Sequence, residues 1–540
     1  MKTPLLYLRT LIHLRPRQIY YQLFYRIRVR IRKLVGFQYT QSIPITGYLV
    51  SLIPSLSSNK SYFSEQNCFV FLNQSRSFIN SPINWNDEKI HGKLWAYHLN
   101  YFDFLNQEDI TSTQGLSLMR TYLQDGRKLQ TGFEPYPVSL RGINWIKFLS
   151  KYKINDSTID GFLMAQYVRL TDNLEYHLMG NHLLENAFSL LFGGYYFRNE
   201  AFISLAKKIL QEELPEQILS DGGHFERSPM YHQIILLRVL DCLNLVRNNQ
   251  VYEEQQLEQI LTFYAQKMLN FLQKITFKNG EIPLVNDAAK NIAPTTKQLV
   301  EYAQKLNFHQ QLSTNQRLNN SKLSESGYRK FETQDFELLM DVGNIAPDYQ
   351  PAHAHCDTLS FVLYIYGKPL IVDTGTSTYE NNEIRQSERS TFAHNTVQIG
   401  EFDQSEAWSS FRVGRRAKAT ILSENEDKII ASHDGYKRLG VIHERSFTVE
   451  NQQIIIQDRI IGETNHVQKA HLHFHPDIDV KVEGNDVNTN LCNITFENIK
   501  DIKQSNYFFS EEFNQKIPAK MLTLIFKQYL TTTISHRPIP

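Results

Sequence analysis

The sequence predicts an α+β multidomain protein, with an array of antiparallel helical hairpins followed by an antiparallel β-sandwich. From about Trp95 to residue 320, apolar residues recur at three- and four-residue steps over long stretches, which is the period of amphipathic helices. Beyond residue 320, short runs of apolar residues alternate with Gly, Asn and Asp turns, which is typical of antiparallel strands. The 540 residues are enough for two or three domains with substantial cores.

Four helices are predicted from the clearest periodic stretches of the first half. Short Gly, Asn and Pro breaks separate these stretches, and Pro229 near the start of the third is a typical first-turn residue. The four predicted helices cover residues 181–197, 200–218, 228–246 and 256–275.

Strand-like runs fill the second half, after a polar stretch at about 319–333. We therefore expect a basic N-terminal extension over 1–90, the helical domain over 91–320 and the β-sandwich over 321–540. The predicted strand regions are 336–343, 359–367, 395–400, 428–436, 445–460, 469–480 and 521–530.

The composition is that of a folded globular protein, with 41% hydrophobic and 12% aromatic residues. A net charge of +1 gives no reason to expect a polyanionic partner for the chain as a whole, and no nucleic-acid-binding module is recognisable. The four cysteines lie far apart without a C-x-x-C pair, which argues against a disulfide framework and against a cysteine-rich zinc site.

The N-terminal segment departs from this neutral balance. Residues 1–64 contain no Asp or Glu, whereas residues 1–33 carry nine Lys and Arg interleaved with aromatic and aliphatic residues. One interpretation is a basic amphipathic helix docked on the main body, and the other is contact with an anionic membrane surface or an acidic polymer. No clear signal peptide or spanning segment is recognisable, so we expect a cytoplasmic protein or one peripheral to the inner membrane, with the periplasm as an alternative.

The most informative motif lies between Pro351 and Asn395. His353 and His355 are two residues apart, and residues i and i+2 of a strand point to the same face, so both imidazoles are expected in one pocket. Asp373 follows a strand-like run and His394 precedes another. Two imidazoles and a carboxylate are ligands that zinc prefers, so the spacing indicates a metal site or a catalytic site.

The helical half supplies further candidates in three polar segments. Asn181 and His182 open one predicted helix, where Asn181 could also act as a cap. His224, Glu226, Arg227, Tyr231 and His232 crowd around the start of another. In the third segment, Arg141, Asn144 and Trp145 suit the binding of an anionic sugar, since a guanidinium binds carboxylate or sulfate in a bidentate manner; the alternative is an ordinary helix with a buried Trp.

Taken together, the motifs NH…LEN, GGHFERSPMYH, H-A-H-x-D-x-LSF, LIVDTGT and FAHN resemble those of the heparinase II/III-type polysaccharide lyases, relatives of the oligoalginate lyases. The resemblance runs from about Trp95 to the C-terminus with the motifs in the family's order. It implies an (α/α) toroid followed by a β-sandwich, with the active site between them.

The resemblance also implies roles for individual residues. Tyr231 matches the general acid, which often also serves as the base, and His353 matches a histidine that assists proton transfer. Asn181 and His182 match the pair that neutralises the substrate carboxylate. Beyond the resemblance, we expect four further residues to contact the substrate: His224, Glu226, Arg227 and His232. The implied ligands of a structural metal, usually Zn²⁺, are His355, Asp373 and His394.

These residue types suit β-elimination from a uronate. Removal of the C5 proton places negative charge on the adjacent carboxylate, which hydrogen bonds from Asn and His stabilise in the transition state. A tyrosine base would need nearby positive charge, for which His224, Arg227 and His232 are the candidates. The partner is then an acidic uronate polysaccharide or oligosaccharide.

Two other functions compete with this one. The first is a non-catalytic protein of exopolysaccharide biosynthesis that binds an acidic polysaccharide, which the basic N-terminus favours. The second is a zinc-dependent hydrolase in which His355, Asp373 and His394 hold an activated water. Lyases of this type are usually exported, so a chain without a recognisable signal peptide resembles members of surface-polysaccharide biosynthesis clusters.

Overall fold

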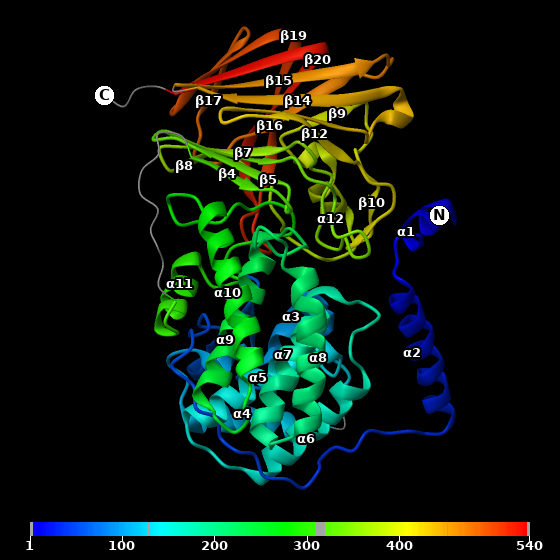
Figure 1. Cartoon of the computed structure of the whole chain (residues 1–540), viewed down its shortest axis with the longest axis vertical. Helices are drawn as coiled ribbons and strands as arrows, with labels where there is room; N and C mark the ends of the chain where they lie inside the picture. The colour runs from blue at the N-terminus through cyan, green and yellow to red at the C-terminus, as the bar shows by residue number, and fades with distance from the viewer. Residues whose placement is uncertain (1–3, 127–128, 309–318, 451, 537–540) are drawn as a thin grey trace.

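The computed structural model describes residues 4–126, 129–308, 319–450 and 452–536. Figure 1 shows a helical part at one end of the molecule and a β part at the other, with the N-terminal helices along one side. The predicted fold class, a helical domain followed by an antiparallel β domain, is confirmed. Residues 309–318, just before the expected domain boundary, lie outside the described residues.

The helices form where the apolar period is longest. Each of the four predicted helices matches one observed helix, and Pro229 is a first-turn residue as expected, with the Ser228 hydroxyl accepting from the Tyr231 N–H. The helices are α1 Pro4–Leu11, α2 Pro16–Leu34, α3 Glu88–Tyr101, α4 Ser112–Gln124, α5 Pro135–Lys151, α6 Ser157–Asp172, α7 Gly180–Phe197, α8 Glu200–Gln217, α9 Pro229–Asn248, α10 Gln255–Ile275, α11 Thr296–Lys305 and α12 Glu383–Glu388.

Helices α5, α7 and α9 form the centre of the helical part and are buried on almost every side. Residues preceding α3 also contribute to this core, since Val50, Phe69 and Trp85 are buried in the same apolar cluster. Part of the segment expected to be an N-terminal extension therefore packs as an integral layer of the helical domain. None of the helices in the described ranges combines the length and apolar character needed to cross a bilayer.

The β part contains two facing sheets. Within the described residues, five strands in the order β4-β5-β6-β7-β8 form the smaller sheet, and the larger follows β12-β13-β14-β15-β20-β19-β18-β17, with β16 attached to β20 and β9 attached to β16. A separate three-stranded sheet, β1-β2-β3, packs on the helical part, and β10 and β11 form a two-stranded sheet. The strands of all these sheets are β1 Tyr62–Phe63, β2 Cys68–Phe71, β3 Gln74–Ser77, β4 Asn319–Leu323, β5 Tyr328–Glu332, β6 Phe336–Asp341, β7 Phe361–Ile365, β8 Lys368–Ile371, β9 Val397–Ile399, β10 Ala407–Trp408, β11 Arg412–Val413, β12 Ala419–Glu424, β13 Lys428–His433, β14 Val441–Val449, β15 Gln453–Gly462, β16 Gln468–His473, β17 Val480–Glu483, β18 Asp486–Thr489, β19 Cys492–Phe509 and β20 Ile517–His536.

The two sheets bury one apolar core between them. Leu338 and Leu363 of the smaller sheet belong to the same buried cluster as Phe447 and Leu524 of the larger sheet. Alternation of inward apolar and outward polar residues along β14 and β15 produces this layer, as in other sandwiches. The β part is held against the helical part by the loops described next.

One local expectation is wrong. His353 and His355 do not lie in a β-strand, because β6 ends at Asp341 and β7 begins at Phe361, and the residues between them form a loop. The side chains in that loop are oriented by hydrogen bonds to a segment of the helical part rather than by strand alternation.

Candidate active site

A tyrosine of the helical part and a histidine of the β part meet face to face. Tyr231, in the first turn of α9, stacks on His353, with ring centroids 3.9 Å apart and an interplanar angle of 29°. The phenol oxygen lies 3.4 Å from that of Tyr379. Tyr231 remains partly accessible, whereas only 7% of His353 is exposed. Two residues expected to take part in proton transfer are thus in direct contact.

Asp287 holds the loop that carries His353. This fully buried carboxylate, in the segment between α10 and α11, lies 3.0 Å from His353 Nδ1 and 2.9 Å from His355 Nε2. Arg385 of α12 donates to the same carboxylate at 2.6 Å. Burial opposes ionisation, but the Arg385 guanidinium and the two imidazoles hold the pKa of Asp287 well below its usual range. The carboxylate therefore orients three side chains of the β part at once.

Backbone hydrogen bonds fix the same contact. The Asp287 N–H donates to the carbonyl of His353, and the His355 N–H donates to the Asn286 side chain. From the helical side, the Ser228 hydroxyl donates to the carbonyl of Asp287 at 2.9 Å. Because Ser228 also caps α9, the start of the helix that carries Tyr231 is tied to the His353 loop through a single residue.

Asn181 and Glu226 form a buried hydrogen-bonded unit beside this pair. The Asn181 amide donates to both carboxylate oxygens of Glu226, at 3.0 and 2.7 Å, and the Asn181 N–H donates to the same group at 3.0 Å. The second Glu226 oxygen lies 3.4 Å from His353 Nε2. Burial raises the pKa of Glu226, but His224, His353 and the Asn181 donors outweigh this effect and leave it lowered. Glu226 therefore connects Asn181 to His353.

His182 lies one position further along α7 and is more accessible, with about one-third (34%) of its side chain exposed. Its Nδ1 lies 3.0 Å from Glu175, and its ring centroid lies 4.6 Å from that of Tyr136. Burial lowers the pKa of His182, but the Glu175 carboxylate outweighs burial, so the pKa is raised. An imidazole in this environment favours the charged form, which suits a contact with a substrate carboxylate.

The three residues predicted to bind a metal lie close together: His355, Asp373 and His394. They offer three donor atoms within 4.8 Å of one another, and all three residues are buried. In the described part of the chain, His355 Nδ1 and His394 Nε2 are buried without a hydrogen-bond partner, while His394 Nδ1 lies 2.7 Å from Asp373. Buried unpartnered imidazole nitrogens beside a carboxylate fit a zinc-like cation, and Asp287 supplies the outer contact that orients His355.

Arg141, Asn144 and Trp145, which we expected to bind substrate, lie in the protein core. Their helix α5 is packed on all sides, and exposure of these residues is 0%, 3% and 0%. The Arg141 guanidinium donates to the Gln166 side chain and to the carbonyls of Asn100 and Gly132. These three residues stabilise the helical domain, so their expected role in binding is corrected to a role in packing.

The charges expected to help ionise Tyr231 are also placed elsewhere. Burial lowers the pKa of His224 to about 4 and that of His232 to about 3, so both rings are neutral at physiological pH. Arg227 donates to the carbonyls of Glu325 and Asn344, away from the phenol. Burial accordingly raises the pKa of Tyr231. The phenol keeps its proton, which corrects the expectation of an ionised tyrosine supported by these neighbours.

Sequence reasoning missed Asp287, Arg385, Tyr379 and Glu175. Asp287, Tyr379 and Arg385 act through contacts between segments far apart in the chain, whereas Glu175 contacts His182, seven residues further along. Asp287 occurs in the unremarkable loop sequence VNDAAK, where no spacing marks it. A buried carboxylate with three cationic or imidazole neighbours becomes recognisable only after the domains are docked.

The sequence and the fold are similar to those of known proteins. Residues 78–313 match the family model for the heparinase II/III N-terminus, and residues 315–536 match that for the heparinase II/III-like C-terminal domain. A heparin-sulfate lyase of Bacteroides stercoris is 26% identical over 330 residues, covering 56% of this chain and 46% of that protein. A heparin-sulfate lyase of Pedobacter heparinus is 24% identical over 407 residues, covering 70% of this chain and 57% of that protein.

The chain therefore spans about half the length of the curated relatives that it matches. A crystal structure of heparinase III superimposes with a TM-score of 0.68 at 17% identity, covering 96% of this chain and 92% of that one. The structure of a heparan sulfate lyase of Pedobacter heparinus gives a TM-score of 0.56 at 17% identity, with coverages of 86% and 79%. At this identity the structural likeness establishes the shared fold.

Proposed function

The chain belongs to the heparinase II/III family, and from this premise we propose that it cleaves an acidic, uronate-containing polysaccharide by β-elimination. The substrate class is supported by the relatives named heparin-sulfate lyases. The observation that carries the proposal is the stacked pair of Tyr231 and His353, which places two proton-transfer groups in contact beside Asn181 and His182.

In the proposed reaction, the substrate carboxylate lies against His182. Removal of the C5 proton shifts charge onto this carboxylate, so a cationic imidazole there stabilises the transition state more than the ground state. Asn181 lies beside His182 in the first turn of α7, where Glu226 fixes its amide. Their expected role as the carboxylate-neutralising pair remains a proposal.

We assign the C5 proton to His353 and the leaving-group proton to Tyr231. Because the ionised Asp287 can only accept, Nδ1 of His353 carries the donated hydrogen, and Nε2 is left to take the substrate proton. Glu226, 3.4 Å from Nε2, attracts the positive charge that forms. Tyr231 retains its proton because burial raises its pKa, so it serves as the acid.

The atoms balance without water. The C5–H and C4–O4 bonds break, a C4=C5 double bond forms, His353 gains the C5 proton and Tyr231 protonates O4. Return of the proton from the imidazolium to the phenolate restores both groups, whose rings are in direct contact. The products are a new chain end on one fragment and an unsaturated uronate on the other.

A bound Zn²⁺ would supply a fixed cross-link among His355, Asp373 and His394, which is a structural role. Exposure of these residues is 0%, 3% and 0%, so a polymer has no direct approach to them. Burial of all three donors disfavours the alternative of a zinc-dependent hydrolase, in which the metal-bound water must reach the substrate.

The proposal predicts that Tyr231→Phe abolishes elimination while the fold is retained. Loss of the acid should lower kcat by about 100- to 10,000-fold, the usual contribution of a positioned proton-transfer group. The measurement is the ultraviolet absorbance of the unsaturated uronate product, recorded over a panel of uronate polymers including heparan sulfate.

Tyr302→Phe is the matched control, since Tyr302 is a buried tyrosine of the helical core that donates to Asp241. It should retain kcat. Release of reducing ends by the wild type without the absorbance change would show hydrolysis and exclude the lyase. Equal rates for wild type and Tyr231→Phe would exclude the assigned acid.

A further inference from the structure

The N-terminal arm, defined as α1 and α2 (residues 4–34), lies along one side of the molecule and touches both domains (Figure 1). The Gln18 amide of α2 donates to the carbonyls of Leu178 and Tyr349, one in each domain. Further along, Arg28 and Arg32 pair with Asp172. The inner face of α2 is therefore attached by hydrogen bonds and ion pairs, together with ring contacts of Tyr21 and Tyr25.

The outer face of α2 is apolar and open to solvent. Its residues recur at three- and four-residue steps on the side opposite Gln18, so they form one continuous stripe. They are Tyr20, Leu23, Ile27, Ile31 and Leu34, with exposures of 61%, 55%, 55%, 54% and 86%. A surface helix of a soluble domain normally turns such a stripe inward, and a contiguous exposed stripe indicates a binding surface.

Helix α1 continues this surface. Its buried contact is Thr10, whose hydroxyl accepts from the Trp408 indole. Leu5, Leu8 and Leu11 on its other sides are each at least half exposed, at 51%, 58% and 50%. Both helices of the arm thus present apolar side chains away from the protein.

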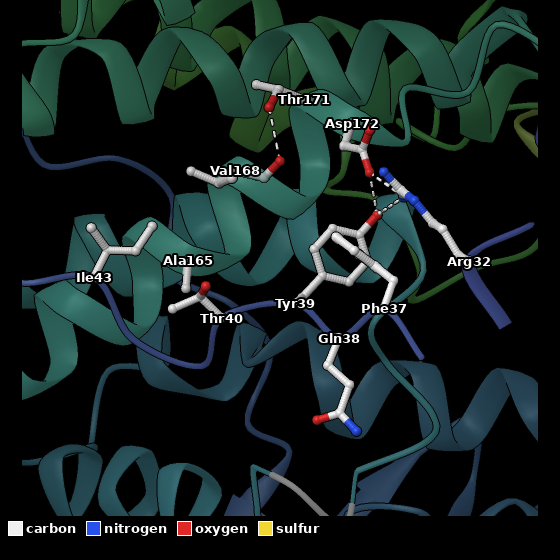
Figure 2. A pocket seen from close by; sticks show the side chains of 10 residues that line it. All are labelled: Arg32, Phe37, Gln38, Tyr39, Thr40, Ile43, Ala165, Val168, Thr171 and Asp172. Atoms are coloured by element: carbon white, nitrogen blue, oxygen red, sulfur yellow. Dashed lines mark hydrogen bonds and ion pairs between the residues drawn. The ribbon is translucent and has the colours of Figure 1, made fainter. Parts of the chain in front are cut away.

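A hollow of about 510 Å³ lies at the C-terminal end of α2. Figure 2 shows Arg32, Tyr39 and Asp172 joined at one side of it and the apolar side chains of Ile43 and Val168 at the other. Asp172 offers no free negative charge, because it is paired with arginines of the arm. Phe37, 45% exposed at the rim, extends the apolar surface beyond the helix.

The charge on this surface is entirely positive. Arg26, Arg30 and Lys33 flank the apolar stripe, and in the described part of the chain their side chains have no recorded hydrogen-bond or ion-pair partner. No Asp or Glu occurs in residues 1–64. Two copies meeting through this face would bring like charges together, which opposes self-association. A hydrated acidic polysaccharide would leave the aliphatic stripe uncovered.

We propose that the N-terminal arm is a docking surface for an anionic lipid bilayer. The apolar stripe enters the boundary between headgroups and acyl chains, while Arg26, Arg30 and Lys33 contact lipid phosphates. The attachment is interfacial, consistent with the arm lying flat along the protein rather than forming a spanning helix. It is independent of whether the chain is a lyase.

The test is co-sedimentation of the full chain with vesicles of phosphatidylcholine alone or mixed with phosphatidylglycerol. One variant is Leu23→Ser/Ile27→Ser/Ile31→Ser, and another is Arg26→Gln/Arg30→Gln/Lys33→Gln. The matched control is Phe263→Ser/Leu422→Ser/Val467→Ser, which removes side chains of similar exposure (56%, 52% and 49%) outside the arm. Circular dichroism confirms that each variant is folded.

We expect wild type and control to bind the anionic vesicles and to be released by salt. The charge variant should bind on the order of 100-fold more weakly, at about 1 kcal/mol per basic residue, and the apolar variant should also lose binding. Equal binding of the wild type and both variants to the anionic vesicles would overturn the proposal. So would a wild type that binds phosphatidylcholine vesicles but not those containing phosphatidylglycerol. A dimer in sedimentation velocity that the apolar variant disperses would instead assign the face to a second copy.

Discussion

At the scale of single residues, His182 has a distinctive environment among the site histidines. Burial makes His224 and His232 neutral, whereas Glu175 keeps the pKa of His182 above its ordinary value. A site that must neutralise a carboxylate needs one imidazole in the charged form and no others competing with it. The difference arises from the Glu175 carboxylate, which lies 3.0 Å from Nδ1 of His182. No motif in the sequence marks Glu175.

This environment predicts the pH dependence of the reaction. Because the folded pKa of His182 is raised, its charge is fully present below the unfolded value near 6.5 and is lost as pH rises through the folded pKa. Glu175→Gln should therefore move the alkaline limb of kcat/KM to lower pH, as measured by pH–rate profiles. Glu213→Gln, a buried glutamate of α8 that accepts from Gln217, is the control and should leave that limb unchanged. An unshifted limb in Glu175→Gln would contradict the role of His182.

At the scale of elements, the segment from β8 to β9 carries three separate anchors. It holds Asp373 directly after β8, Arg385 on α12 and His394 just before β9. Asp373 and His394 contact each other, whereas Arg385 donates to Asp287, and all three lie within one connection of the β part. A metal among His355, Asp373 and His394 would join both ends of this segment to the His353 loop.

We therefore expect chelation to destabilise the chain. Removing a tightly bound ion should lower the thermal midpoint by roughly 5–10 °C, since binding only to the folded state adds a few kcal/mol. Differential scanning calorimetry with and without chelator, together with elemental analysis for zinc, measures this effect. His394→Ala should lose the metal and become insensitive to chelator, whereas His433→Ala, a buried histidine in β13, should retain both. An unchanged midpoint on chelation would contradict the metal site.

Helices and strands could be predicted from the sequence where the spacing of apolar residues stays regular over a long stretch. The apolar stripes of α7, α8, α9 and α10 are local patterns, so their helices could be identified from sequence. The loop of His353 and His355 could not, because its conformation depends on Asp287, more than sixty residues earlier in the chain. Both rings contact the same carboxylate, and they do so from a loop rather than from a strand.

At the scale of the whole molecule, Asp287 connects the two domains. It comes from the segment that follows α10, and its three side-chain partners belong to the β part. Burying an unpaired carboxylate lowers the stability of the folded chain, so the charge of Asp287 is tolerated only when the domains are docked and its partners are in place. The burial of Arg141 and Trp145 has a different origin, because their neighbours all lie within the helical part, but it was equally hidden from the sequence of α5.

Asp287→Asn should consequently lower both stability and activity. Removing one partner of a buried ion pair costs about 3–5 kcal/mol, and His353 would lose its fixed tautomer. The matched control is Asp458→Asn, because Asp458 is a buried carboxylate bonded to Arg445 and His443 within the larger sheet. Chemical denaturation should show similar losses of stability, but only Asp287→Asn should lower kcat under conditions where both variants are folded. Equal kcat values for the two variants would assign Asp287 a structural role alone.

The stacking of Tyr231 on His353 has a consequence for how the protein could have originated. Each domain contributes one member of the pair, so neither half alone, expressed as a fragment or encoded as a separate gene, contains both groups that the proposed reaction needs. The proposed activity could therefore come under selection only once both halves occurred in one polypeptide or associated stably. An insertion that moves the two rings apart by a few ångströms would disable the proposed chemistry.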